Sequence, residues 1–273
     1  MNIRIPGIHI IVVLLTSMLL CSCSTSQQIY GGTHSLQDLK DLHVRSGKHP
    51  TGFINPIRLA ALKEAGIGVG ARSGLAFRAR QINGILEKND RQLRQLFDFQ
   101  QMLLPHNVLP PILVESRAQL RLADPNTIRL ADRSYRIVEQ ARFVTAAPQW
   151  REYLWMDFDF PVRPDPTLLP KNKYERAQWV KFVSQGWQRG IAQANEIYRE
   201  NLSLIQRDFT GMALYRRLLT QQVVSAPYVA RTALGVTGNA DNVRINDQVL
   251  RITALPELSP DSAHWRPVLT DDE

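Results

Sequence analysis

Between Lys173 and Gln221, apolar residues recur at an interval of eleven positions. The recurring residues form three sets: Val180, Ile191 and Leu202; Val183, Ala194 and Ile205; and Trp187, Tyr198 and Phe209. An eleven-residue repeat corresponds to about 3.67 residues per turn, close to the period of a straight α-helix. Asn172, with Glu175 three residues later, matches a helix cap. The stretch predicts either one helix about 70 Å long or two ordinary helices that bend at residues 186–190 or at Gly211.

The first half of the chain has helical patterns on both sides of a glycine-rich segment. Residues 55–65 begin with Asn-Pro, which predicts a short helix with proline in its first turn. Residues 75–104 repeat apolar side chains at helical spacing and predict an amphipathic helix of about eight turns that ends at Pro105. The segment between them, Gly66–Gly74, lacks the glycine spacing and the lysine of phosphate-binding loops. It therefore predicts a flexible or tightly packed junction between helices.

A period of two, typical of strands, appears in the middle of the chain and again near its end. Residues 109–120 start with two prolines and predict a strand or a short helix. In residues 127–144, alternating apolar residues flank the polar Ala131–Arg133, which predicts a β-hairpin that turns there. The segment 148–156 predicts a short helix with two buried tryptophans. After Val223, turns rich in Gly, Asn and Asp separate two or three more strands.

These patterns together predict an α+β fold in which long amphipathic helices pack with short antiparallel hairpins. We expect four parts: a signal peptide at 1–22, a lipidated flexible tether at 23–52, an α+β domain at 53–267 and a polar tail at 268–273. The tether is rich in Ser, Gly, His and Lys and has no sustained apolar period.

The signal peptide is predicted from an apolar run of about 13 residues, Ile8–Leu20, with one preceding charge at Arg4. The run is shorter than the roughly 20 residues that a membrane-spanning helix needs. It leads into LLCSC, Leu19–Cys23, which resembles the bacterial lipobox because Cys23 has an aliphatic residue three positions before it and Ser22 directly before it.

We therefore expect cleavage before Cys23 and attachment of lipid to that residue. An ordinary signal peptide or a short uncleaved anchor is the alternative. Ser24 stands where lipoproteins retained at the inner membrane usually carry Asp, which favours the outer membrane. Because lipid would occupy the single cysteine of the mature chain, no intramolecular disulfide and no cysteine-based metal site is expected.

The formal net charge of +8 is spread along the chain and mixed with acids. A nucleic-acid-binding protein usually gathers such charge into one patch, so we expect no direct nucleic-acid binding. The histidines are not spaced as helix-borne metal ligands, and no nucleophile elbow or P-loop occurs. Glu115-Ser116 resembles the catalytic pair of lytic transglycosylases, but that family's downstream Gly-Leu-Met-Gln segment is missing. We expect no catalytic, cofactor or metal site and no enzyme activity; the alternative is a lipoprotein that binds or processes cell wall.

Several segments in a fixed order resemble the DotC family of type IVB secretion systems, which includes lipoproteins of conjugative plasmid transfer. They are LPPILVE (109–115), IRLADRSYRIVEQARFVTAAPQWREYL (128–154), LLPKN (168–172), GWQRGIAQA (186–194), APYVA (226–230), LGVTG (234–238) and RINDQVLRITALP (244–256). The resemblance covers about residues 55–267.

The resemblance implies an outer-membrane lipoprotein of a secretion core complex, lipidated on the cysteine that Cys23 matches. Members of that family act with a second lipoprotein, DotD, to bring DotH to the outer membrane, and no enzyme activity is attributed to them. We expect the folded part to pack into a ring beneath the membrane. Buried aromatic residues often dominate such contacts, so Trp179, Trp187 and Tyr198 are candidate interface residues. The alternative for each of them is packing in the chain's own core. The sequence leaves open whether the transported substrate is DNA or protein.

Overall fold

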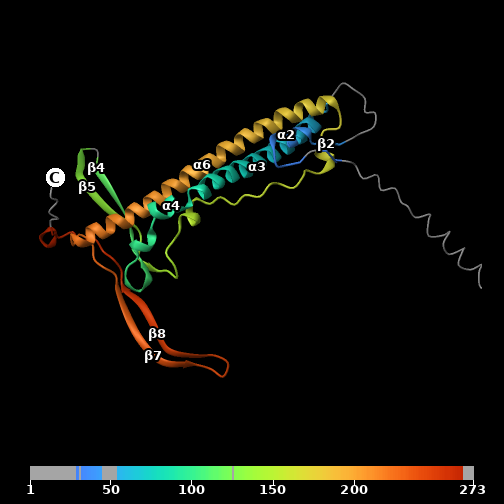
Figure 1. The fold of residues 1–273 in the computed structure, drawn as a ribbon. Coiled ribbons are helices and arrows are strands. Elements are labelled where there is room, and N and C mark those ends of the chain that lie inside the picture. Colours follow the sequence, from blue (N-terminus) through green and yellow to red (C-terminus); the bar gives the residue numbers. More distant parts are fainter. Residues whose placement is uncertain (1–28, 31, 45–53, 125, 267–273) are drawn as a thin grey trace, which may run out of the picture. The chain divides into compact units, whose positions relative to one another are not determined.

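The computed structural model of the chain describes residues 29–30, 32–44, 54–124 and 126–266 (Figure 1). The chain forms two compact units. Of the described residues, unit 1 contains those up to Gly74 and Phe160–Gly190, and unit 2 contains those of Leu75–Asp159 and those from Ile191 onward. The predicted signal peptide, the lipidation site at Cys23 and the polar tail at 268–273 lie outside the described residues.

The longest element is α6, Lys173–Thr220, a continuous helix of 48 residues that contributes to both units (Figure 1). The single-helix alternative is therefore correct, and neither residues 186–190 nor Gly211 breaks the helix. The predicted cap is also present, because the side-chain oxygen of Asn172 accepts a 2.9 Å hydrogen bond from the Glu175 amide. At about 1.5 Å per residue, the helix is roughly 70 Å long.

The second long helix, α3, runs from Pro56 to Lys88 without interruption. The prediction of a junction at Gly66–Gly74 is wrong, since these glycines lie inside the helix. The predicted helix end at Pro105 is also wrong. Asn89 follows α3 and its side-chain amide donates to the Ile85 carbonyl at 2.8 Å, so it competes for the hydrogen bonds of the last turn.

Close packing within unit 1 explains Gly66, Gly70 and Gly74 of α3, which lie against α6. A Cβ atom added to Gly70 would lie 2.5 Å from the carbonyl oxygen of Val183 on α6. A Cβ atom on Gly186 of α6 would lie 2.3 Å from the carbonyl oxygen of Ile67 on α3. The two backbones approach closely only where side chains are absent. This contact offsets the roughly 0.5–1 kcal/mol by which a mid-helix glycine is less favourable than alanine.

Part of the predicted tether is folded into unit 1. Its elements are β1 (Ile29–Tyr30), α2 (Leu36–Asp41) and β2 (His43–Val44), with β1 and β2 antiparallel. The expectation of a flexible tether is therefore wrong for these residues. The reason is a short capped helix: the Ser35 hydroxyl accepts from the Asp38 amide at 3.1 Å, and Leu39 is fully buried.

Unit 2 is built around a core to which several segments contribute. They include α4 (Asp90–Leu96), α5 (Trp150–Leu154) and the 3₁₀ turn Phe99–Met102, and further 3₁₀ turns in the chain span Pro105–Asn107, Pro166–Leu168 and Ser262–His264. The helix predicted at 148–156 is confirmed as α5. Its first tryptophan, Trp150, is buried, whereas Trp155 is 38 % exposed, so the prediction of two buried tryptophans holds only for the first.

The strands of unit 2 form three separate antiparallel pairs. They are β3 (Val108–Leu109) with β6 (Arg142–Phe143), β4 (Ile112–Asp124) with β5 (Thr127–Glu139), and β7 (Tyr228–Gly238) with β8 (Val243–Ala254). These hairpins and the long helices confirm the α+β fold class. Of the two or three strands predicted after Val223, the structure has two, β7 and β8, among the described residues.

The turn predicted at Ala131–Arg133 is wrong, because these residues lie in the middle of β5. Ala131 pairs with Gln119 of β4, and the chain reverses between Asp124 and Thr127. The sequence Asp-Pro-Asn at 124–126 has stronger turn chemistry than Ala-Asp-Arg. Of the segment 109–120, for which a strand or a short helix was expected, residues 112–120 lie in β4, the strand partner of β5, and Leu109 lies in β3.

Candidate assembly surface

The outer part of the β4–β5 hairpin exposes an aliphatic face. Leu120 pairs with Leu130 and Leu122 pairs with Ile128 across the two strands. Directly opposed residues of an antiparallel pair lie on the same face, so the four side chains form one patch. All four are exposed, and Leu130 is the most exposed at 77 %. We call this patch, Leu120, Leu122, Ile128 and Leu130, the first hairpin face.

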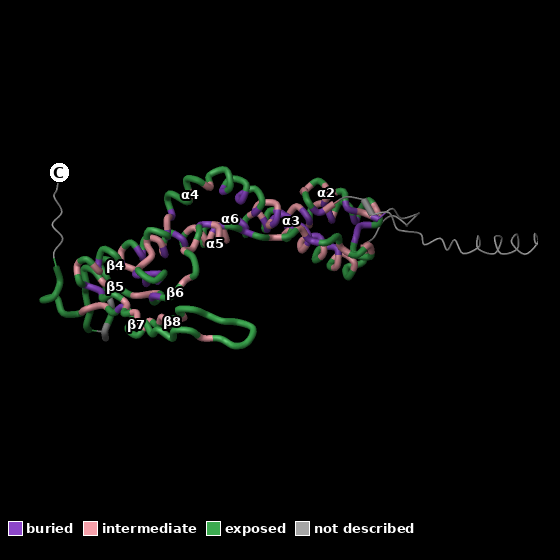
Figure 2. Tube along the Cα trace, turned by 60° about the horizontal axis from the view of Figure 1, so that its bottom comes forward, coloured by how far each residue is buried: buried purple, intermediate pink, exposed green. Residues whose placement is uncertain are grey.

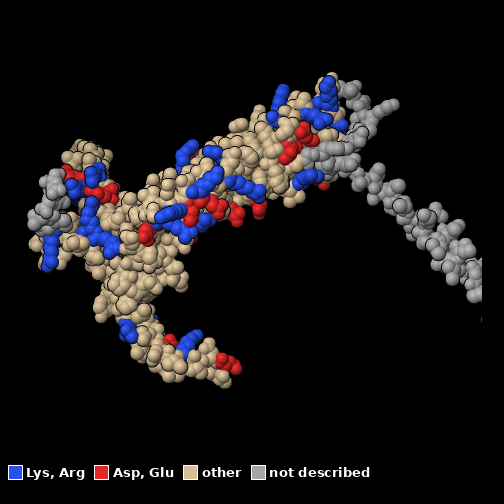
Figure 3. Space-filling model, in the orientation of Figure 1, with Lys and Arg blue, Asp and Glu red and all other residues tan. Residues whose placement is uncertain are grey.

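The β7–β8 hairpin exposes a similar patch near its tip. Val243 and Ile245 of β8 lie two positions apart and share one face of that strand. Val236 of β7 lies at the register irregularity between Gly235 and Thr237, close to the end of the hairpin where Gly238 pairs with Val243. Ile245 is 75 % exposed, and the tube view shows the outer part of the hairpin as exposed along both strands (Figure 2). In the space-filling view most of the hairpin surface is uncharged, with a few side chains of both signs on its outer part and at its tip (Figure 3). We call Val236, Val243 and Ile245 the second hairpin face.

Both hairpin faces would be stabilised by a partner that covers them. An isolated two-stranded hairpin is at best marginally stable in water. Contiguous exposed apolar patches commonly mark protein or membrane contacts. Within the described residues, each of these hairpins is a two-stranded sheet with no third strand. The two faces are therefore the surfaces of unit 2 best suited to assembly.

The base of the β4–β5 hairpin, in contrast, is anchored in a small core of unit 2. Leu113 packs there with Tyr215 and Leu218 of α6. Burial raises the pKa of Tyr215 to about 12, so its hydroxyl stays protonated at neutral pH. It donates to the Ser225 carbonyl at 3.3 Å. One end of the hairpin is thus fixed while its outer part remains available for contacts.

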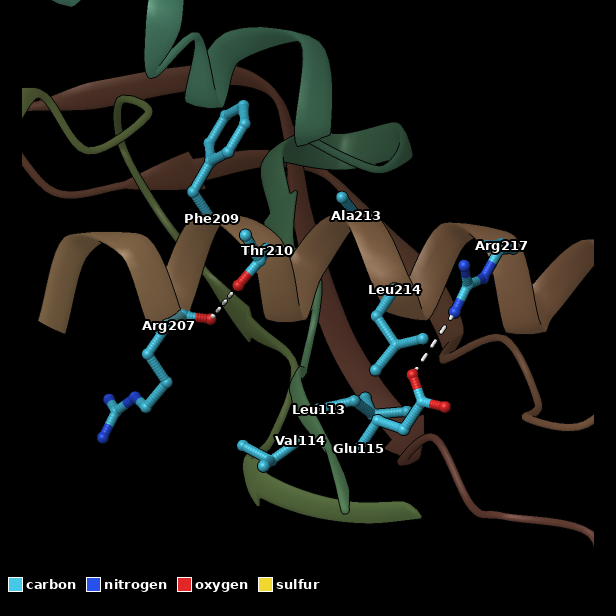
Figure 4. A pocket seen from close by; sticks show the side chains of 9 residues that line it. All are labelled: Leu113, Val114, Glu115, Arg207, Phe209, Thr210, Ala213, Leu214 and Arg217. Atoms are coloured by element: carbon cyan, nitrogen blue, oxygen red, sulfur yellow. Dashed lines mark hydrogen bonds and ion pairs between the residues drawn. The ribbon is translucent and has the colours of Figure 1, made fainter. Parts of the chain in front are cut away.

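An uneven charge cluster lies on β4 just beyond this base. The carboxylate of Glu115 lies 3.3 Å from Arg117, 3.9 Å from Arg133 and 3.7 Å from Arg217 of α6. The close view draws the pair with Arg217 (Figure 4). One carboxylate therefore faces three guanidinium groups, which leaves an excess of positive charge. Glu115, which resembles the catalytic acid of lytic transglycosylases in its sequence context, is thus held in a network of ion pairs.

Trp179 and Trp187 lie in the interior of unit 1, where Trp179 is fully buried and Trp187 is 5 % exposed. The Trp179 ring donates to the Leu39 carbonyl at 2.8 Å. Tyr198 is partly buried and packs against the core of unit 2. Burial assigns the two tryptophans a packing role in this chain, and the predicted role of the three residues in subunit contacts stays a prediction.

Sequence reasoning missed the two hairpin faces. The signal was present in the alternation of Leu120 and Leu122 with polar residues. Such alternation normally indicates a face that packs on the chain's own core, and only the structure shows that nothing in the described residues covers it. In the part of the chain that the structure describes, no group of three or more His, Cys, Asp or Glu side chains is placed to hold a metal ion. No helix there has the length and apolarity to cross a membrane.

Comparison with known families gives these surfaces a context. Residues 56–267 match a family described as type IV secretory system, conjugal DNA-protein transfer. The chain belongs to this type IV secretory family. No curated protein was found to be similar to it. The resemblance inferred from the sequence is confirmed at the level of type IV secretion and conjugation.

The region shared with the type IV secretory family contains both long helices and both hairpin faces. Secretory machines of this kind are assemblies, and a subunit of such an assembly needs surfaces that bind neighbours. The exposed aliphatic faces of the two hairpins meet that requirement. They are therefore the candidate functional site of this member of the family.

Proposed function

We propose that the chain is a structural subunit of a type IV secretion or conjugation core complex, of the DotC type, and that it has no catalytic role. The observation that carries this proposal is the pair of uncovered hairpin faces within a chain of a type IV secretory family. In such a subunit, the free energy gained by burying aliphatic side chains is realised on assembly.

The proposal includes a lipid anchor at the outer membrane. Acylated Cys23 would hold the chain at the periplasmic face, since two or three acyl chains give nearly irreversible membrane binding. A DotD-like lipoprotein and a DotH-like subunit are the proposed partners, arranged with this chain in a ring. The support for this part is the lipobox-like segment Leu19–Cys23 and the ordered sequence resemblance.

The anchor is tested by labelling cells with a palmitate analogue and comparing Cys23→Ser with Cys21→Ser. We expect the wild-type chain and Cys21→Ser to incorporate label and Cys23→Ser to lose it, because only Cys23 has a small residue directly before it and an aliphatic residue three positions earlier. Globomycin, which blocks the lipoprotein signal peptidase, should cause the unprocessed wild-type chain to accumulate. Normal processing with the inhibitor would contradict the anchor.

The structural role is tested against the cell-wall alternative with the purified chain and isolated peptidoglycan. A structural subunit should neither sediment with peptidoglycan nor release soluble fragments from it. Retention or turnover of peptidoglycan would contradict the proposal and favour a protein that binds or processes cell wall.

A further inference from the structure

A groove of about 580 Å³ runs between the base of β4 and the second half of α6, within unit 2 (Figure 4). Its apolar floor includes Leu113, Phe209 and Leu214, and Val114, Glu115 and Arg217 also line it. Leu214 is partly buried, while Ala213 on the same stretch of α6 is exposed. The groove is therefore open to solvent and combines apolar surface with charge.

Three consecutive residues of β4, Leu113 to Glu115, line this one groove. Successive side chains of a strand point to opposite faces of the sheet. A groove that contacts three in a row must therefore lie along the edge of the strand. At Leu113 this edge is covered by α6, since a Cβ atom on Gly211 would lie 2.7 Å from the Leu113 carbonyl oxygen. From Glu115 outward, β4 pairs only with β5 among the described residues, so this part of the edge carries backbone groups without a strand partner. Such edges accept an added strand from another chain.

The charges around the groove are not symmetric. Arg207 at one end is balanced by two carboxylates, since it lies 3.1 Å from Glu139 and 2.6 Å from Asp208. At the other end, Arg217 shares the single carboxylate of Glu115 with two further arginines. The side chain of Arg217 is 57 % exposed. This end of the groove is thus suited to receive one more carboxylate.

We propose that this groove binds an extended segment of another subunit that adds as a strand to the outer edge of β4. An apolar side chain of that segment lies over Leu214, which points toward β4 in Figure 4, and a carboxylate pairs with Arg217. This inference rests on the proposed function in one respect: it assumes that a neighbouring subunit is present. It adds that the neighbour contributes an extended segment with an apolar side chain and a carboxylate. Backbone hydrogen bonds supply affinity in this mode, while the groove and Arg217 supply specificity.

The test uses the purified full chain and two fluorescent probe peptides of alternating valine and threonine, one with two glutamates and one with two lysines in the same positions. Fluorescence anisotropy should show binding of the glutamate peptide and much weaker binding of the lysine peptide. Arg217→Glu should lower the affinity for the glutamate peptide by about tenfold or more, the loss expected for one charge-assisted hydrogen bond.

Matched controls separate this site from general electrostatic attraction. Arg199→Glu changes an exposed arginine of the same helix outside the groove, and it should leave binding unchanged. Two further glutamate peptides carry N-methyl groups on alternate backbone nitrogens, each on a different edge of the strand. Only the peptide whose unmethylated edge faces β4 should bind. Thermal unfolding should show that the variants remain folded.

Equal binding of the two peptides, no effect of Arg217→Glu, or an equal effect of Arg199→Glu would overturn the inference. No binding of either peptide would overturn it as well. None of these outcomes bears on the lipidation and peptidoglycan tests, so failure of this inference is distinguishable from failure of the proposed function.

Discussion

At the scale of single residues, Arg58 and Glu175 of unit 1 form an ion pair with several further hydrogen bonds. The Arg58 guanidinium lies 3.1 Å from the Glu175 carboxylate and also donates to the carbonyl oxygens of Leu169, at 2.7 Å, and Thr167. Glu175 also accepts from the Lys171 amide at 2.8 Å. These contacts join the start of α6 to the start of α3 and to the preceding 3₁₀ turn.

The pKa of Glu175 links this network to pH. Burial raises its pKa, but hydrogen bonds from Arg58 and the Lys171 backbone, together with the positive charges of both side chains, hold it below its ordinary value of 4.5. A lowered folded-state pKa adds stability that is fully present above the ordinary value and is lost as the pH falls through the folded-state value.

We therefore expect Glu175→Gln to lower the free energy of unfolding at pH 7 by about 1–3 kcal/mol. The difference from the wild type should shrink as the pH is lowered below 4.5. Urea titrations at several pH values measure both effects. Glu196→Gln is a suitable control, because Glu196 forms an exposed pair with Arg199 and should change stability by less than about 0.5 kcal/mol. A difference that does not depend on pH would contradict the assignment.

Trp187 gives a second prediction at this scale. It is buried in unit 1, so Trp187→Ala should lower the free energy of unfolding of the isolated chain by about 3–5 kcal/mol. Urea denaturation followed by circular dichroism measures this. An unchanged unfolding midpoint combined with loss of assembly would instead place Trp187 at a subunit interface.

At the scale of elements, the glycine contact between α3 and α6 in unit 1 depends on the absence of side chains. Gly70 faces the α6 backbone, whereas a Cβ atom on Gly68, two positions earlier, would meet nothing within 4 Å. Both residues lie in the same helix. Substituting Gly68 therefore changes helix propensity alone, whereas substituting Gly70 changes both helix propensity and the packing against α6.

Gly70→Ala should lower the free energy of unfolding by about 1–3 kcal/mol or more, because the added methyl group must push the helices apart. Gly68→Ala should raise it by about 0.5–1 kcal/mol through better helix propensity. Thermal unfolding of the two variants measures the contrast. Equal changes of the same sign in the free energy of unfolding would show that Gly70 is not required for the close approach of the two helix backbones.

The elements also show how far sequence alone leads. The eleven-residue period and the Asn172–Glu175 cap correctly predicted that this stretch is helical and where it begins, because both signals are local, but they left open whether it forms one helix or two. The glycines at 66–74 favour a junction by local propensity, and only the contact with Val183 and Trp187 of α6 explains why the helix continues. The register of β4 and β5 was mispredicted because two polar segments, residues 124–126 and 131–133, could each form the turn. The exposure of the hairpin faces was not predicted because a sequence pattern does not specify whether another part of the chain covers an apolar face.

The first hairpin face gives a prediction that separates assembly from folding. Leu130→Asp changes a side chain that is 77 % exposed, so the stability of the isolated chain should change by less than about 0.5 kcal/mol. Binding to other subunits should be strongly reduced, because a carboxylate would be buried in an apolar contact. Thr127→Asp, an exposed change on the same strand, should leave both properties intact. Thermal unfolding and co-purification with other subunits measure the two effects.

An isolated chain in which Leu130→Asp unfolds, while Thr127→Asp does not, would assign the face to folding and not to assembly. Equal co-purification of all three chains would show that the first hairpin face is not a subunit contact.

At the scale of the whole molecule, the described chain keeps the core of each unit within itself and leaves its aliphatic hairpin faces uncovered. Membership of a type IV secretory family supplies the context in which such faces are covered by neighbours. The proposed anchor at Cys23 would place this assembly at the outer membrane, and the proposed groove at β4 would accept a strand from a neighbour. The account thus assigns folding to the two cores and assembly to the hairpins.

The most direct test of this account is the size and composition of the complex solubilised in detergent from cell envelopes, for the wild type, Cys23→Ser and Leu130→Asp. The account predicts a very large particle that contains other secretion subunits. In Cys23→Ser this particle should be lost or mislocalised, and in Leu130→Asp it should be lost. A small species that contains only this chain, with the same size in all three cases, would contradict the claim that the protein is a subunit of a secretion core complex.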